Sequence, residues 1–145
     1  RLLMLCSGTL CEGWACYITS LAGERGFLSS KEQYAEIASR RRMAARAVVD
    51  VRLHYGQYSL DDAARYYVEK AKMPEAAARS EAVKNSLFPG GAVMYLYGTE
   101  GMTELREAMK RRRGDDFSLQ QFHDDVLSYG GIPVARIAEE MKYLH

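Results

Sequence analysis

The stretch SSKEQYAEIASRRRMAARAVVDVRLHY, residues 29–55, decides the class of fold. Either of its two leading serines can cap a helix, because the hydroxyl accepts a hydrogen bond from a free backbone N–H of the first turn. Glu32 or Gln33 then stands at the reciprocal position of a capping box. The stretch therefore predicts a long helix over about residues 31–55.

Helix start and stop signals recur on the C-terminal side of this stretch. Ser59 and Ser118 suit N-cap positions, the latter in a capping box, and Pro74 suits a first helical position. Three arginines before Gly114 are typical of a cationic last turn followed by a glycine stop. A last helix is expected over about residues 134–144, and no strand with a period of two residues is found. These signals predict an all-α fold of six or seven helices, packed as one irregular bundle in a single domain over residues 1–145.

The composition restricts the function classes. The chain has 145 residues, of which 48% are hydrophobic and 27% charged, and its formal net charge is +1. These values are typical of an ordinary globular domain and exclude wholesale disorder. Two arginine triplets, residues 40–42 and 111–113, lack interleaved aromatic residues, so helix-surface charge explains them and no nucleic-acid partner is expected.

The segment over residues 2–23 is apolar apart from Glu12 and a few hydroxyl groups. It has nearly the length that spans a bilayer, but the charge near its midpoint and glycines at Gly8 and Gly13 argue against a transmembrane helix. We predict a buried helix that carries one carboxylate. Such a carboxylate is costly unless it is paired or bound to a metal, so Glu12 needs a partner that its neighbours do not supply.

Cys6, Cys11 and Cys16 are spaced five residues apart. On a helix each successive member turns by about 140°, so the three thiols would point in three directions. This arrangement does not suit one metal site, and a disulfide within a helix at this spacing has poor geometry. We therefore expect small buried thiols in a reducing compartment, which favours the cytoplasm over export unless a signal peptide precedes Arg1.

One face of the long helix carries Arg42, Arg46, Asp50 and His54 at a spacing of four residues. This pattern has two interpretations. It is either a solvated face with salt bridges, or a chain of groups in which Asp50 orients His54 for a supporting role at a site.

Several motifs, in the same order along almost the whole chain, resemble a large bacterial family, the domain-of-unknown-function 885 family. They are Glu12-Gly13-Trp14-Ala15 with Tyr17; Arg46-Ala47-Val48-Val49-Asp50 with His54; the Tyr58–Ala63 turn and helix start; Glu81; Pro89-Gly90 with Ala92 and Tyr95; and Phe122-His123-Asp124 within the final Phe117–Pro133 pattern.

This family resembles zinc metallopeptidases of the Glu-zincin type. The resemblance implies that Glu12 is the third zinc ligand, while a His-Glu-x-x-His helix supplies two histidine ligands and the glutamate that activates water. This chain has no such motif, and the resemblance places it upstream of Arg1. We therefore expect the C-terminal half of a larger zincin-like fold. Zinc is expected only together with the missing segment, and the chain alone is expected to be inactive.

The resemblance also implies residues that stabilise the transition state or contact the substrate. Tyr95 and His123 are the candidates to donate a hydrogen bond to the developing oxyanion of a peptide-like substrate. Arg46, Asp50 and His54 would support the site, and Lys84 would contact substrate. Lys84 and Asn85 replace the Arg-Tyr pair of the family, and Gly91 replaces its Gln, so the sequence leaves substrate recognition and the mode of cleavage open.

The alternative function is a non-catalytic helical interaction or scaffold module that lacks the metal site. Apolar surface where the metal-binding helix would pack would then be covered by a partner, by the N-terminal part of the protein or by a second copy in a homo-oligomer.

Overall fold

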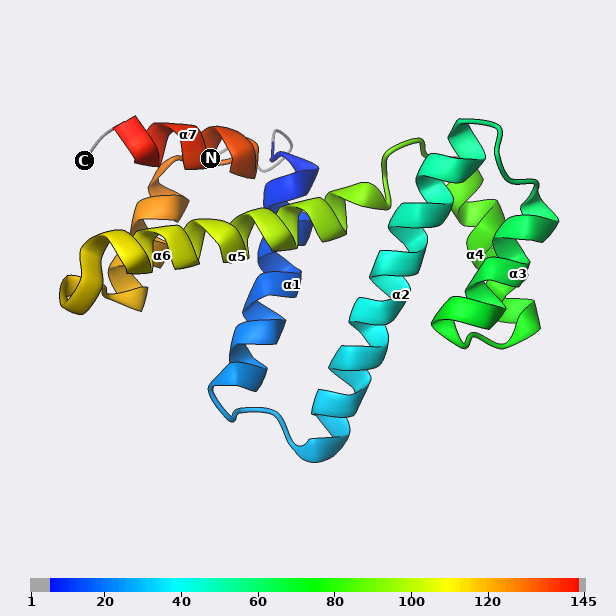
Figure 1. Ribbon diagram of the computed structural model, residues 1–145, viewed down its shortest axis with the longest axis horizontal. Helices are drawn as coiled ribbons and strands as arrows, with labels where there is room; N and C mark the ends of the chain where they lie inside the picture. The colour runs from blue at the N-terminus through cyan, green and yellow to red at the C-terminus, as the bar shows by residue number, and fades with distance from the viewer. Residues whose placement is uncertain (1–5, 144–145) are drawn as a thin grey trace. The chain divides into compact units, whose positions relative to one another are not determined.

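The computed structural model describes residues 6–143, and this part of the chain is all-α, as predicted (Figure 1). It contains seven α-helices and no strand within those residues. The helices are α1 (Gly8–Glu24), α2 (Ser30–His54), α3 (Leu60–Ala71), α4 (Glu75–Ser86), α5 (Val93–Arg113), α6 (Leu119–Ser128) and α7 (Val134–Tyr143), with a short 3-10 helix, η2 (Gly114–Asp116), after α5.

The helix starts follow the predicted capping. The Ser29 hydroxyl accepts from the Glu32 backbone N–H and the Glu32 carboxylate accepts from the Ser29 N–H, which is the predicted capping box. Ser118 accepts from the backbone of Gln121, but the return contact of a capping box is not part of this cap. Pro74 precedes α4 instead of opening it, because its ψ of 144° is extended and helical geometry begins one residue later.

The backbone divides into two compact units, and each is described by itself. The α2–α4 unit comprises residues 18–96, and the α6–α7 unit comprises residues 1–17 and 97–145. The prediction of one domain over residues 1–145 stays a prediction.

In the α2–α4 unit, α2, α3 and α4 pack around a core made largely of alanine. The short side chains let the helices approach closely, and Tyr67 and Val49 fill the remaining space without exposure to solvent. The core residues are Ala45, Val49, Ala63, Ala64, Tyr67, Ala71, Ala78 and Ala82.

In the α6–α7 unit, α1 crosses α5 at two glycines. A Cβ added to Gly13 would lie 2.4 Å from the carbonyl carbon of Gly98, and one added to Gly98 would lie 2.0 Å from the Thr9 carbonyl oxygen. The backbones therefore touch, and only glycine fits at either position. This contact explains the glycine of the Glu12–Ala15 motif.

The prediction for the cysteines is wrong at one pair. Cys6 and Cys11 form a disulfide, with their Cα atoms 6.4 Å apart, and Cys16 is a free, half-buried thiol. The geometric objection assumed that both cysteines lie in one helix. Because α1 begins at Gly8, Cys6 belongs to the preceding non-helical segment and can reach back to Cys11. The argument from free thiols to a reducing compartment no longer holds.

No helix among residues 6–143 combines the length and apolarity needed to cross a bilayer, in agreement with the sequence prediction.

Candidate functional site

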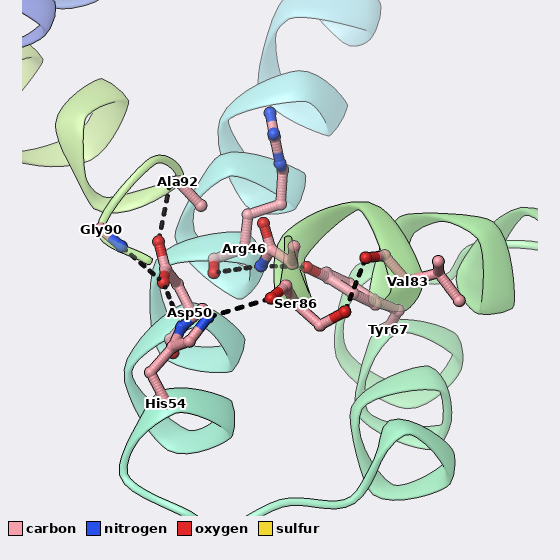
Figure 2. Close-up of polar contacts among 9 residues, drawn as sticks. Arg46, Asp50, His54, Tyr67, Val83, Ser86, Gly90 and Ala92 are labelled. Carbon is pink, nitrogen blue, oxygen red and sulfur yellow. Dashed lines mark hydrogen bonds and ion pairs between the residues drawn. The ribbon is translucent and has the colours of Figure 1, made fainter. Parts of the chain in front are cut away.

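Asp50 is the centre of the polar network in the α2–α4 unit (Figure 2). The residue is 1% exposed, and its Oδ1 accepts hydrogen bonds from the Gly90 backbone N–H at 2.9 Å and from Nδ1 of His54 at 2.9 Å. Its Oδ2 accepts from the Ala92 backbone N–H at 2.8 Å. The buried charge is therefore well satisfied, and it ties the Pro-Gly turn and the start of α5 to α2.

His54 lies among oxygen acceptors that belong to Asp50 and Ser86. Its Nδ1 contacts both the backbone carbonyl oxygen of Asp50, at 2.8 Å, and the Asp50 carboxylate, while Nε2 lies 3.4 Å from the Ser86 carbonyl oxygen (Figure 2). An imidazole needs a proton on both nitrogens to donate on both sides. The pKa of His54 is accordingly raised, first by the Asp50 carbonyl and then by the Ser86 carbonyl and the Asp50 carboxylate, against the opposing effect of burial.

Arg46 joins α2 to α4 and to the start of α5. Its Nε lies 2.8 Å from Oε1 of Glu81, and the two side chains are 12% and 19% exposed. The N–H and the carboxylate oxygen are not aligned as a hydrogen bond, so the contact is an ion pair in partial burial. The guanidinium also lies over the ring of Tyr95, 5.2 Å from its centroid, in a cation–π contact that fixes the position of this ring.

Asn85 is a residue whose role the sequence did not reveal. Its side-chain amide donates to the Arg46 carbonyl at 3.0 Å and to the Tyr67 hydroxyl at 2.8 Å. Burial raises the pKa of Tyr67 well above its ordinary value, so its hydroxyl stays protonated. Asn85 was noted only as a departure from the family pattern, whereas here it closes the polar network from the inside.

Lys84, the neighbour of Asn85, was predicted to contact substrate. Its side chain is exposed and lies outside the network formed by the described residues. The α2–α4 unit thus brings Arg46, Asp50, His54 and Tyr95 into one connected set, and it leaves Lys84 on the surface.

One surface hollow of this unit does not contain the predicted residues. It has a volume of about 420 Å³ and lies on α3 and α4, where Arg79 pairs with Asp61 and Glu75. Exposed ion pairs of this kind contribute little and are ordinary surface features, so we give more weight to the Asp50 network.

His123, in the α6–α7 unit, has different surroundings. Its Nε2 lies 3.0 Å from the hydroxyl of Tyr17, and its ring meets Trp14 edge-on with centroids 5.3 Å apart. The Arg106 guanidinium lies over the Tyr17 ring, 5.4 Å from the centroid. Burial, and then the charge of Arg106, lower the pKa of His123, while Asp124 opposes them. The imidazole of His123 is therefore neutral near pH 7, and its pKa is shifted in the direction opposite to that of His54.

Glu12 lies on α1 in the same unit and is half-buried. Among residues 6–143 no three histidine, cysteine, aspartate or glutamate side chains gather as metal ligands. Glu12 is therefore at most one ligand of a zinc site, and the described residues do not by themselves fit a zinc ion.

The fold and these networks define an all-α member of a bacterial family. The chain belongs to the family described as bacterial protein of unknown function (DUF885), whose model matches residues 1–141. No functionally curated protein matches it.

Two solved structures are similar to the chain. One is titled "The crystal structure of the putative lipoprotein from Colwellia psychrerythraea", with 30% identity, a TM-score of 0.87 and a match that covers 94% of this chain. The other is titled "The structure of a putative lipoprotein of unknown function from Shewanella oneidensis", with 27% identity, a TM-score of 0.84 and 93% coverage. The chain spans only about a quarter of each, 24% and 25%.

Proposed function

We propose that this chain is part of a zinc-dependent, metallopeptidase-like hydrolase, to which it contributes Glu12 as one metal ligand. Glu12 carries this proposal: it is a half-buried carboxylate in an otherwise apolar segment, and no hydrogen bond or ion pair satisfies it within the described residues. Such a group is costly to retain unless a cation binds it. The motif resemblance supports the same assignment.

His123 and Tyr95 are the proposed groups on the oxyanion side. A neutral imidazole has one N–H, and a phenol has one O–H, and each can stabilise a developing negative charge on a peptide-like substrate. The lowered pKa of His123 supports its role as a neutral donor. Arg46 restricts the Tyr95 ring, and Asp50 restrains the turn that precedes it, so both act as supports. Lys84 remains a candidate to attract a substrate carboxylate, because it is an exposed cation on the surface of α4.

The metal assignment is tested by native mass spectrometry of the protein isolated from its own source, which reports its mass and bound metal together. We expect one zinc ion in the wild-type protein and its loss in Glu12→Gln, which keeps the size of the side chain but removes its charge. Glu104→Gln is the matched control, since Glu104 is an exposed carboxylate of the same unit. Full zinc content in Glu12→Gln, or a metal-free wild-type protein, would contradict the proposal.

We further propose that the protein works outside the reducing cytoplasm. The Cys6–Cys11 disulfide and the titles of both solved structures, each of which names a "putative lipoprotein", support this compartment. Thiol titration of the denatured, unreduced protein checks it: one reactive thiol, that of Cys16, is expected, and three would contradict the disulfide.

A non-catalytic interaction module is the second candidate, and exposed apolar side chains favour it. Tyr55, Leu87 and Phe88 are 79%, 65% and 67% exposed on the α2–α4 unit. Surface of this kind suits a protein partner or a second copy. Metal-free protein that dimerises with rising concentration would support this candidate over the hydrolase, whereas zinc-loaded monomer would exclude it.

A further inference from the structure

The surroundings of His123 contain a group for which the proposed function has no role. Tyr17 lies on α1, is 1% exposed, and places its hydroxyl 3.0 Å from Nε2 of His123 on α6. The two residues are 106 positions apart in the sequence, so their contact is a product of the tertiary fold.

We propose that Tyr17 is a positioning residue for His123: its phenolic O–H donates to Nε2, so that the imidazole keeps its proton on Nδ1 and offers this N–H to a ligand. This inference rests on the proposed function, in which the ligand is the developing oxyanion of the substrate. It adds the residue that decides which ring nitrogen faces that oxyanion.

The direction of the hydrogen bond follows from the chemistry of the two groups. A phenol O–H is a good donor but its oxygen is a modest acceptor, whereas the unprotonated nitrogen of an imidazole is a strong acceptor. Burial of Tyr17 keeps bulk water from competing for this contact. The hydrogen bond made by one ring nitrogen fixes the protonation of the other.

The charges that face the imidazole agree with this assignment. Arg106 on α5 lies over the Tyr17 ring and disfavours a second positive charge on His123, and burial acts in the same direction. Asp124, the neighbour of His123 on α6, opposes both with a smaller effect. The imidazole is therefore neutral near pH 7 and has a single N–H, which stands on Nδ1 when Nε2 accepts.

Nδ1 is the nitrogen left for a ligand. It makes no hydrogen bond within the described part of the chain, and the His123 side chain is only half-buried. The aromatic neighbours Trp14 and Phe122 restrict the ring, with centroids 5.3 Å and 5.6 Å from that of the imidazole. Tyr17 thus sets the tautomer, while these contacts limit how far the ring can turn.

A long-range nitrogen–proton correlation NMR spectrum of the isotope-labelled protein tests the proposal directly near pH 7. We expect His123 to show a protonated Nδ1 and an unprotonated Nε2. A proton on Nε2 in the wild-type protein would overturn the proposal, and no variant needs to fold for this result to count.

Variants distinguish an effect on the tautomer of His123 from an effect on its pKa. In Tyr17→Phe, which keeps the ring and loses only the hydroxyl, we expect His123 to move toward the Nε2–H form and its pKa to rise. In Arg106→Gln we expect the pKa to rise while Nδ1 stays protonated, because the Tyr17 contact remains. Tyr129→Phe, a tyrosine of the same unit outside this cluster, should change neither property. An unchanged tautomer in Tyr17→Phe would contradict the positioning role.

This measurement is independent of metal and of activity. If the protein holds no zinc but His123 shows the Nδ1–H form, the proposed function fails and the positioning role of Tyr17 stands. If zinc is bound but Nε2 is protonated, the positioning role fails and the proposed function stands.

Discussion

Each unit contains one of the two histidines among the described residues, and the surroundings of these histidines shift the pKa in opposite directions. His54, in the α2–α4 unit, faces carbonyl and carboxylate oxygens, and its pKa is raised. His123, in the α6–α7 unit, faces a phenol, two aromatic rings and the charge of Arg106, and its pKa is lowered. The surroundings of the two histidines therefore shift the pKa of the same residue type in opposite directions.

The packing of the two units differs in a corresponding way. In the α2–α4 unit a buried carboxylate, Asp50, joins α2 to the start of α5 through two backbone N–H groups. In the α6–α7 unit α1 and α5 meet by backbone contact at Gly13 and Gly98, and this contact involves no charged group. The contact between α2 and the start of α5 depends on electrostatics and hydrogen bonding. The contact between α1 and α5 depends on two glycines, which have no side chain. Three sets of variants test this difference between the units, from the largest expected effect to the smallest.

Removal of the Asp50 carboxylate should have the largest effect. Asp50→Ala leaves the N–H groups of Gly90 and Ala92 and the His54 imidazole without their acceptor in a buried position. We expect a loss of about 3–5 kcal/mol in the free energy of unfolding, measured by urea denaturation followed by circular dichroism. Asp61→Ala, which removes a 71% exposed carboxylate paired with Arg79, should cost less than about 1 kcal/mol. Equal losses in the two variants would show that the Asp50 network does not support the unit.

A methyl group at the glycine contact should have the next largest effect. Gly13→Ala places a Cβ 2.4 Å from the Gly98 carbonyl carbon, where only a shift of the backbone can relieve the overlap. We expect a loss of about 3 kcal/mol, and Trp14, the one tryptophan, reports it by fluorescence from within this unit. Gly23→Ala on the same helix is the control, because its Cβ would lie 3.6 Å from Leu28 Cδ1 in ordinary contact. This control should be neutral or gain up to about 1 kcal/mol from helix propensity, and a similar loss would refute the backbone contact.

The two histidines should give pH dependences of opposite sign, with the smallest effects. The raised pKa of His54 means that its contribution to stability is complete below about pH 6.5 and is lost as the pH rises through the folded-state pKa. The lowered pKa of His123 means that its contribution is complete above about pH 6.5 and is lost as the pH falls through the folded-state pKa. Urea midpoints of the wild-type protein, His54→Gln and His123→Gln between about pH 5 and pH 8 measure both differences. Slopes of the same sign would contradict the contrast between the sites.

Local patterns predicted most of the helices, because a helix start is decided within a few residues. Ser29 and Ser59 cap their helices as expected from side chains three residues apart. The end of α5 is also decided locally. It follows the Arg111–Arg113 run at Gly114, because a glycine at positive φ, here 54°, stops a helix. The sequence could also indicate the pairing of Asp50 with His54, because a spacing of four residues places both groups on one helical face.

The disulfide shows where a local argument failed. The spacing of Cys6 and Cys11 excluded a bond only if both lay in a helix, and the start of α1 at Gly8 was not predicted. Residues 2–5 of the predicted apolar helix lie outside the described residues. A shift of a few residues in one helix boundary was thus enough to change the expected state of two cysteines and, with it, the expected compartment.

The sequence by itself determined the all-α class, the caps and the candidate residues, because these depend on interactions between near neighbours and on motifs of fixed spacing. Only the tertiary structure decided what surrounds each candidate. Asn85 bonds to Tyr67 and Arg46 across 18 and 39 positions, and Tyr17 bonds to His123 across 106. Burial and nearby charges set the pKa of a histidine, and both arise from residues that are distant in the sequence. The opposite states of His54 and His123 therefore follow from the packing of the helices.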